Sequence, residues 1–126
     1  MKTKTRKKPN RTAMTREADR LFSRQVRARG HCELWLLAPE VRCAGEYQCC
    51  HVISRRYRST RWTFDNAFCG CQSHHVFFTH RPEAFYLAVE ASYPGLYGRL
   101  YEMAQKPWDK SLTAVLDRLR ASEETL

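Results

Sequence analysis

The sequence predicts a single α+β domain, with short strands in the middle of the chain and helices on both sides. Apolar residues recur at helical spacing in residues 15–29 and again beyond Pro82. Between these segments, residues 47–54 alternate in the way that a half-buried strand requires. A chain of 126 residues is long enough for one domain with a modest core. We expect residues 1–11 to be an arm and residues 12–126 to form the domain.

Positive charge is concentrated at the N-terminus. Residues 1–30 contain 11 Lys and Arg residues against 2 acidic residues, whereas residues 31–80 contain 5 against 4 and residues 81–126 contain 6 against 7. The arm lacks apolar periodicity and includes Pro9, which indicates a flexible basic segment. A basic arm on a nearly neutral body suits a polyanion partner, because each neutralised phosphate releases a condensed counterion. The alternative is a tail that only increases solubility.

Neither a membrane span nor a secretion signal is expected from the sequence. No uninterrupted apolar run approaches the roughly 18 residues of a membrane span. Residues 1–8 have no apolar stretch behind them, as a signal peptide would require. We therefore expect a cytoplasmic protein without a membrane partner. In a reducing cytoplasm, the six cysteines are better explained by metal binding than by disulfides.

The first helix is expected between residues 15 and 29. Thr15 is a suitable N-cap for it, and Gly30 is a suitable terminator. Its apolar stripe consists of Ala18, Leu21, Phe22 and Val26. The opposite face carries Arg16, Arg20, Arg24 and Arg27. That face is either simply solvated or a phosphate contact that continues the basic arm.

The core of the domain is expected at about residues 32–86. Residues 33–41 are predicted to be an apolar loop or a short strand that Pro39 breaks. The strand at 47–54 would place four side chains on one face, namely Tyr47, Cys49, His51 and Ile53. We expect the chain to return as a strand at 62–64.

A basic loop lies between these two strands. Its arginines are Arg55, Arg56, Arg58 and Arg61. Together with Tyr57, they suit the clamping of phosphates and stacking on a base or sugar. Asp65 and Asn66 then indicate a turn or the entry of a helix.

Helical segments are predicted over the remainder of the chain, with the C-terminal helices at 82–122. The expected bounds are 72–79, 82–92, a helix opened by Pro94, and 111–120. Their apolar stripes are Phe85, Ala88 and Val89, then Leu96, Leu100 and Met103, and finally Leu112, Val115, Leu116 and Leu119. We interpret all three stripes as core.

The cysteines and histidines predict a structural zinc site. Zinc prefers four tetrahedral ligands, which usually come as two closely spaced pairs. Cys71-x-x-His74 is one such pair, and Cys32 with Cys43 is the best candidate for the other, although ten residues separate them. Cys69 is an alternative to Cys71. We interpret the remaining cysteines, Cys49 and Cys50, as small packing residues; the alternative for the whole set is free thiols without a metal.

Three further polar residues occur in order along the same segment. They are His51, Asn66 and His75. A neutral histidine whose other ring nitrogen is held by a backbone carbonyl can deprotonate water near pH 7, and His51 lies on a rigid strand. His75 could hold a divalent metal at a phosphate, and Asn66 could fasten the loop or orient the base. The alternative for His51 is a purely structural role.

These residues carry a resemblance to a known family. The segments 48–56, 61–62, 65–67, 71–75 and 77–79 closely resemble phage-type HNH endonucleases, and they are also similar to the NinG/Rap-like recombination nucleases. The resemblance covers about residues 32–86 and implies a ββα-metal (HNH) finger with a structural zinc beside it.

The resemblance also implies roles for individual residues. His51 would be the general base, Asn66 the middle residue and His75 the ligand of a catalytic Mg, Mn or other divalent ion. This sequence departs from the family where His74 replaces a zinc cysteine, and where Cys50 stands in place of an acidic metal ligand. Asp65 is a further candidate ligand for the catalytic metal.

The resemblance implies metal-dependent DNA cleavage with 5′-phosphate and 3′-hydroxyl products, in a phage or prophage context within a bacterial host cell. The DNA contacts would come from the four loop arginines and from Lys7 and Lys8 in the arm. One alternative is a zinc-dependent nucleic-acid-binding module without catalysis. Another is an accessory that binds phage recombination or packaging proteins.

Overall fold

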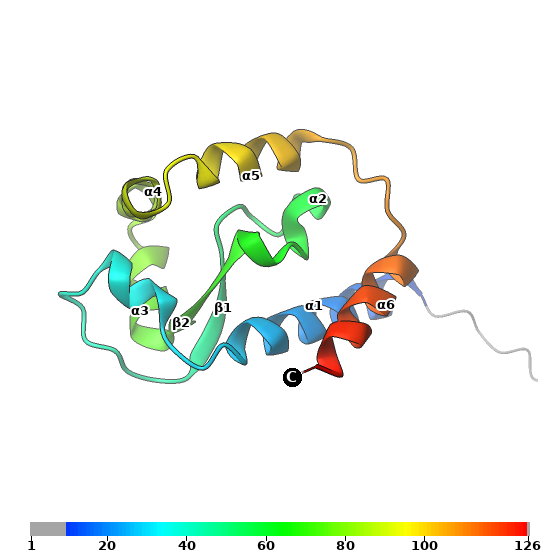
Figure 1. The fold of residues 1–126 in the computed structure, drawn as a ribbon, viewed down its shortest axis with the longest axis horizontal. Coiled ribbons are helices and arrows are strands. Elements are labelled where there is room, and N and C mark those ends of the chain that lie inside the picture. The colour runs from blue at the N-terminus through cyan, green and yellow to red at the C-terminus, as the bar shows by residue number, and fades with distance from the viewer. Residues whose placement is uncertain (1–9, 126) are drawn as a thin grey trace, which may run out of the picture.

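The computed structural model describes residues 10–125, and these residues form an α+β fold, as predicted. A two-stranded sheet lies among six α-helices and two 3₁₀ helices within this range (Figure 1). In chain order the elements are α1 (Arg11–Arg27), η1 (Glu33–Leu37), β1 (Tyr47–His51), α2 (Arg58–Arg61), η2 (Phe64–Asn66), β2 (Ala67–Cys71), α3 (Gln72–Thr79), α4 (Pro82–Ser92), α5 (Leu96–Gln105) and α6 (Leu112–Glu123). None of these helices has the length and apolar character needed to cross a membrane.

The first helix begins earlier than predicted. Asn10 caps it, because its side-chain oxygen accepts a hydrogen bond from the Ala13 backbone N–H at 2.7 Å. Thr15 therefore lies inside α1 rather than at its start, and Arg11 belongs to the helix rather than to the arm. The rest of the predicted arm, residues 1–9 with Lys7 and Lys8, lies outside the described residues.

Two predictions for the middle of the chain are wrong. The segment expected as an apolar loop or short strand at 33–41 begins with the 3₁₀ helix η1, which ends before Pro39. The returning strand is β2 at Ala67–Cys71, not residues 62–64, because the chain first makes the helical turns α2 and η2. β2 is buried at all five positions, so it has no polar alternation that would reveal a strand.

The sheet separates two apolar cores. β1 and β2 pair antiparallel, with Cys50 opposite Phe68 and His51 opposite Ala67. Since side chains alternate along a strand, Ala67 and Cys69 face the core formed by α1 and α6, whereas Cys50 and Phe68 face η1, α3 and α4. The first and last helices thus cover one face, and the predicted stripes of both are buried in the first core.

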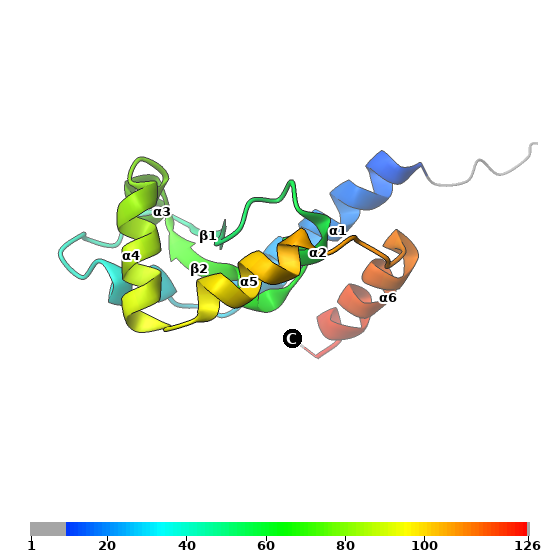
Figure 2. The same ribbon diagram turned by 90° about the horizontal axis from the view of Figure 1, so that it is seen from above.

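The C-terminal half wraps around the loop between the strands. In both views α4, α5 and the following linker form an arc that leads from α3 to α6 (Figures 1 and 2). Leu100 and Ala104 of α5 pack against Ile53, which follows β1. Met103, predicted to be core, is 39% exposed, so the buried stripe of α5 continues through Ala104 instead. This arc covers the segment that follows His51.

Candidate metal centre and histidine groove

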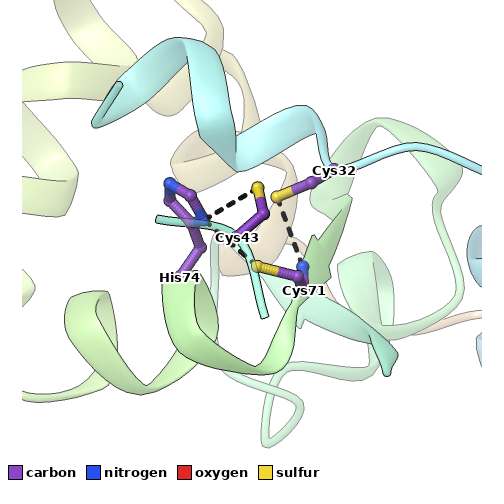
Figure 3. A group of neighbouring side chains, drawn as sticks. All are labelled: Cys32, Cys43, Cys71 and His74. Carbon is purple, nitrogen blue, oxygen red and sulfur yellow. Dashed lines mark hydrogen bonds between the residues drawn. The ribbon is translucent and has the colours of Figure 1, made fainter. Parts of the chain in front are cut away.

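Four predicted zinc ligands converge at the edge of the sheet. The ligand atoms of Cys32, Cys43, Cys71 and His74 all lie within 4.8 Å of one another. Figure 3 shows that Cys32 and Cys43 come from the loops on either side of η1, and Cys71 and His74 from the junction of β2 with α3. Three thiols and an imidazole are the ligands that zinc prefers in structural sites. The four residues fit a metal ion, and the ten-residue spacer between the two loop cysteines does not separate them.

The imidazole of His74 is oriented for metal binding. Its Nε2 atom lies 2.9 Å from the backbone oxygen of Ala38, which can only accept a hydrogen bond, so Nε2 carries the proton. Nδ1 therefore presents its lone pair to the cluster, 3.1 Å from the sulfur of Cys71 and 3.5 Å from that of Cys43. A carbonyl that fixes the distal nitrogen of a ligand histidine is usual around bound metals.

Two thiols of the cluster, Cys71 and Cys43, differ in their tendency to ionise before a cation arrives. Burial acts to raise the pKa of Cys71, but hydrogen bonds from the hydroxyl of Ser73 and the backbone N–H of His74 lower this pKa to about 5. Loss of hydration around its sulfur, together with hydrogen bonds to Cys71 and Cys32, raises the pKa of Cys43 to about 12. A second thiolate beside the first is unfavourable without a positive charge, and a bound divalent cation would remove that penalty.

Close packing of η1 on β2 brings Cys32 to Cys71. A Cβ atom added at Gly70 would collide with the side chain of Leu34, which is only 1% exposed. The backbone N–H of Cys71 donates to the sulfur of Cys32 at 3.3 Å across this contact. Glycine at position 70 is therefore required for the approach that assembles the cluster.

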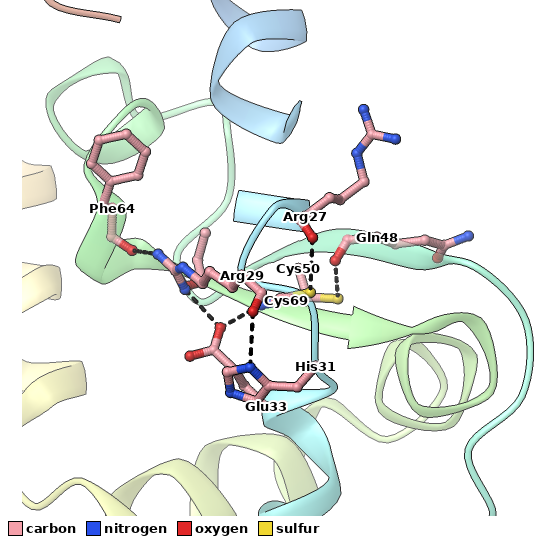
Figure 4. A network of polar contacts seen from close by, with 9 residues as sticks. Arg27, Arg29, His31, Glu33, Gln48, Cys50, Phe64 and Cys69 are labelled. Atoms are coloured by element: carbon pink, nitrogen blue, oxygen red, sulfur yellow. Dashed lines mark hydrogen bonds and ion pairs between the residues drawn. The ribbon is translucent and has the colours of Figure 1, made fainter. Parts of the chain in front are cut away.

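An arginine and a glutamate fasten the same junction (Figure 4). Arg29 donates to Glu33 at 2.7 Å and to the backbone oxygens of Ala67 and Phe64 at 2.8 and 3.2 Å. Glu33 in turn accepts from the backbone N–H of Cys69 at 2.8 Å. These contacts clamp the end of α1 and the start of η1 onto β2, next to Cys32.

The other three cysteines stay outside the cluster. Cys69, the alternative ligand, faces α1, and its thiol donates to the backbone oxygen of Arg27 at 3.9 Å. Cys50 is buried on the opposite face and bonds the backbone oxygen of Gln48 at 3.6 Å. Burial raises the pKa of Cys49 to about 12, which keeps this thiol neutral. Both β1 cysteines pack against core clusters, in agreement with the interpretation of them as packing residues.

His51 and His75 line one groove between α1, β1 and α3. Its volume is about 640 Å³. Charged residues of both signs line it as well, namely Asp19, Arg27, Glu46 and Arg55. We call this cavity the histidine groove. No group of three or more metal-ligand atoms other than the cysteine cluster comes together in residues 10–125, so the groove presents separate histidines rather than a finished metal site.

The ring of His51 is held at the end of β1 with one nitrogen left as a base. Its Nε2 atom lies 3.1 Å from the backbone oxygen of Arg61, so Nε2 carries the proton and Nδ1 keeps its lone pair. The ring stacks on Phe22 of α1, with centroids 5.6 Å apart. Burial lowers the pKa of His51, with a smaller opposing effect from the hydrogen bond to Arg61. The residue is therefore neutral at pH 7.

His75 is oriented in a similar way from α3. Its Nδ1 atom lies 2.6 Å from the side-chain oxygen of Gln48, so Nδ1 is the donor and Nε2 keeps its lone pair. Burial lowers the pKa of His75 as well. His74 and His75 are neighbours in sequence, yet one belongs to the cysteine cluster and the other to the groove.

Asn66 fastens the loop that follows β1. Its side-chain oxygen accepts from the backbone N–H of Ile53 at 2.7 Å, and its amide donates to the backbone oxygens of Ile53 and Thr60 at 3.0 and 3.1 Å. The residue is fully buried. Of the two roles that the sequence left open for Asn66, these contacts correspond to fastening the loop. Asp65 is exposed and does not line the histidine groove.

Asp19 is a groove residue that the sequence analysis did not identify. Arg61 donates to both of its carboxylate oxygens, at 3.0 and 2.7 Å, and Trp62 donates from its indole nitrogen at 2.9 Å. Burial acts to raise the pKa of Asp19, but the hydrogen bond and charge of Arg61 lower it overall. Because the backbone oxygen of Arg61 holds His51, this carboxylate positions the His51 ring indirectly. Asp19 is one of two acids in a helix rich in arginine, and its place in the sequence carries no signal of such a role.

The four loop arginines occupy different environments. Arg55 lines the histidine groove and lies 3.8 Å from Asp19. Arg61 is committed to the ion pair with Asp19, and Arg56 lies over Tyr57 at 5.2 Å. Arg58 lies over Trp62 and Trp108 and lines a different cavity. The structure therefore brings only Arg55 of this set to the groove.

Comparisons with known proteins give no relative for this chain. No protein-family model matches it, and neither a curated protein nor a solved structure shows significant similarity.

Proposed function

We propose that the protein is a metal-dependent DNA endonuclease of the HNH class, with a structural zinc in the cluster of Cys32, Cys43, Cys71 and His74. The observation that carries this proposal is the pair of histidines in one groove. Each has one ring nitrogen fixed by an acceptor, and the other has no hydrogen-bond partner among residues 10–125. The order of β1, β2 and α3 also matches the ββα arrangement that the resemblance implies.

His51 acts as the general base in the proposed reaction. Its Nδ1 atom takes a proton from water, and the water oxygen attacks the phosphorus of the scissile bond. The bond to the 3′-oxygen breaks, and that oxygen takes up a proton, which leaves a 5′-phosphate and a 3′-hydroxyl. A divalent ion such as Mg²⁺ or Mn²⁺, held through Nε2 of His75, would supply positive charge at the phosphate and at the leaving oxygen.

Two positive side chains in the groove support a phosphodiester substrate. Arg27 and Arg55 line it together with the histidines, although Asp19 and Glu46 offset their charge. Asp19 is already neutralised by Arg61, which leaves Arg55 beside a paired carboxylate. The concentration of Lys and Arg in residues 1–30 would add contacts to the DNA backbone that do not depend on sequence.

The position of Cys50 favours a second candidate, a zinc-dependent DNA-binding module without catalysis. The family places an acidic metal ligand there, whereas Cys50 is buried on the face of β1 turned away from the groove. A phage recombination or packaging protein would then be the partner that performs the chemistry. This candidate predicts DNA binding with no cleavage under any divalent metal.

Substitution of the base separates the two candidates. The wild-type protein should nick plasmid DNA in Mg²⁺ or Mn²⁺, and His51→Ala should reduce the rate by about 10²- to 10⁴-fold, the usual cost of losing a general base. DNA binding should be retained. His80→Ala is the matched control, because His80 is exposed and outside the groove. Equal nicking by the two variants would rule out His51 as the base, and no nicking by the wild type would favour the binding module.

A further inference from the structure

A second cavity lies between α2, the linker after α5, and α6. Its volume is about 690 Å³, within the range of about 300–1,000 Å³ that is usual for small-molecule sites. The residues that matter for its chemistry are Arg58, Trp62, Lys106, Trp108, Lys110 and Arg118. Neither His51 nor His75 lines it, so we call it the tryptophan cavity to distinguish it from the histidine groove.

The charge of the tryptophan cavity is positive and largely uncompensated. Among residues 10–125, four cationic side chains line it against a single acid, Asp109. Arg58 makes no ion pair with any residue in 10–125, whereas Arg55 and Arg61 both contact Asp19. Its Nη1 atom is buried without a hydrogen-bond acceptor in the same part of the chain. A guanidinium in this state favours an incoming anion, because buried donors are usually paired.

Aromatic rings, rather than an acid, hold Arg58 in place. Its guanidinium carbon lies 5.3 Å from the ring centroid of Trp108 and 5.9 Å from that of Trp62. The two indole rings are themselves 5.9 Å apart and inclined at 54°. Both rings line the cavity, but Trp62 is 3% exposed, while Trp108 is only partly buried and leaves aromatic surface accessible to a ligand.

A flat aromatic surface beside an unpaired guanidinium suits a ligand that has both an aromatic and an anionic part. We propose that the tryptophan cavity binds a nucleotide, with its base on Trp108 and its phosphate at Arg58, assisted by Lys106 and Lys110. A base can stack on an indole whatever its identity, and such contacts contribute about 1–3 kcal/mol per base. The nucleotide comes either from an unpaired position in a nucleic-acid strand or from a free mononucleotide. This site goes beyond the proposed cleavage, since it binds without any group of the histidine groove.

Binding can be followed directly through the tryptophans. The chain contains three of them, and Trp35 lies away from the cavity on η1. In a Trp35→Phe background, emission therefore reports on Trp62 and Trp108 alone. Saturable quenching is expected with a single-stranded tetrathymidylate or with thymidine 5′-monophosphate. Inorganic phosphate should not reproduce it, because it lacks the aromatic group.

Variants then test the assigned residues. Binding of a fluorescein-labelled tetrathymidylate, measured by anisotropy, should weaken by about 5- to 150-fold in Trp108→Leu, which corresponds to the loss of one stacked base. Arg58→Ala should weaken it as well, and Arg58→Lys should restore only part of the affinity, because the lysine keeps the charge but not the planar group. Arg99→Ala removes an equal charge from the exposed face of α5 and should leave binding unchanged.

The source of the nucleotide follows from competition. Unlabelled mononucleotide that displaces the oligonucleotide at similar concentration supports a free-nucleotide site, whereas displacement by oligonucleotide alone supports a strand-binding site. Affinities of Arg58→Lys and Trp108→Leu equal to that of Arg99→Ala, or equal competition by inorganic phosphate, would overturn the proposal. A wild-type protein that binds in the cavity but never cleaves DNA would refute only the proposed nuclease function, and the reverse result would refute only this inference.

Discussion

The cysteine cluster contains His74 and the histidine groove contains His75, so the two sites meet at adjacent residues. They differ in how completely the fold assembles their ligand atoms. In the cluster four ligand atoms already lie within 4.8 Å of one another. In the groove each histidine is oriented by its own acceptor, and the two are not part of any larger ligand group in residues 10–125. The difference indicates that the fold alone assembles the first site. Under the proposed function, a substrate phosphate and its metal would complete the second.

The largest effect is expected from breaking the assembled site. Cys71→Ser should lose zinc and unfold or aggregate, because structural zinc in small domains contributes about 10–16 kcal/mol of apparent binding free energy that is also folding free energy. Cys49→Ala is the matched control, since Cys49 is a neutral thiol outside the cluster. Metal analysis and thermal melts compare the two. A folded Cys71→Ser protein that keeps one zinc per chain would exclude Cys71 as a ligand.

A smaller effect is expected from loosening the contact that assembles the cluster. Gly70→Ala should destabilise the protein by about 1–3 kcal/mol, the usual cost of overpacking, because the added methyl meets buried Leu34. Gly98→Ala, in α5, meets nothing within 4 Å and should instead stabilise by about 0.4–1 kcal/mol. Denaturant unfolding measures both changes. Equal stability of the two variants would mean that the approach of η1 to β2 does not depend on Gly70.

The smallest effect is expected in how cleavage and stability depend on pH, and it involves the histidine groove alone. Because burial lowers the pKa of His51 below the ordinary value of about 6.5, cleavage should be retained above that lowered pKa and lost as the pH falls through it. The stability contributed by neutral His51 should decline in the same direction, from pH 6.5 downward. The charge of Asp19 raises the pKa of His51, so Asp19→Asn should move the acidic limb of the cleavage profile to still lower pH. A shift to higher pH would contradict this arrangement.

Sequence patterns predicted the elements whose residues have a clear period or a chemical spacing. The stripe of α6 and the bounds of α3 and α4 are as expected, and so is the convergence of the Cys71-x-x-His74 pair with Cys32 and Cys43. β2 escaped prediction because both of its faces are buried. The roles of Asp19 and Gln48 also escaped, since each depends on a contact between residues far apart in the chain.

Whether the two neighbouring histidines serve separate metals is tested most directly by zinc content and plasmid nicking on one preparation of His75→Ala. His80→Ala provides the matched control, because its side chain is exposed and lies outside both sites. We predict that His75→Ala keeps one zinc per chain and its thermal stability but loses metal-dependent nicking, while His80→Ala keeps all three. Loss of zinc from His75→Ala, or nicking at the rate of the control, would contradict the separation of the structural site from the catalytic one.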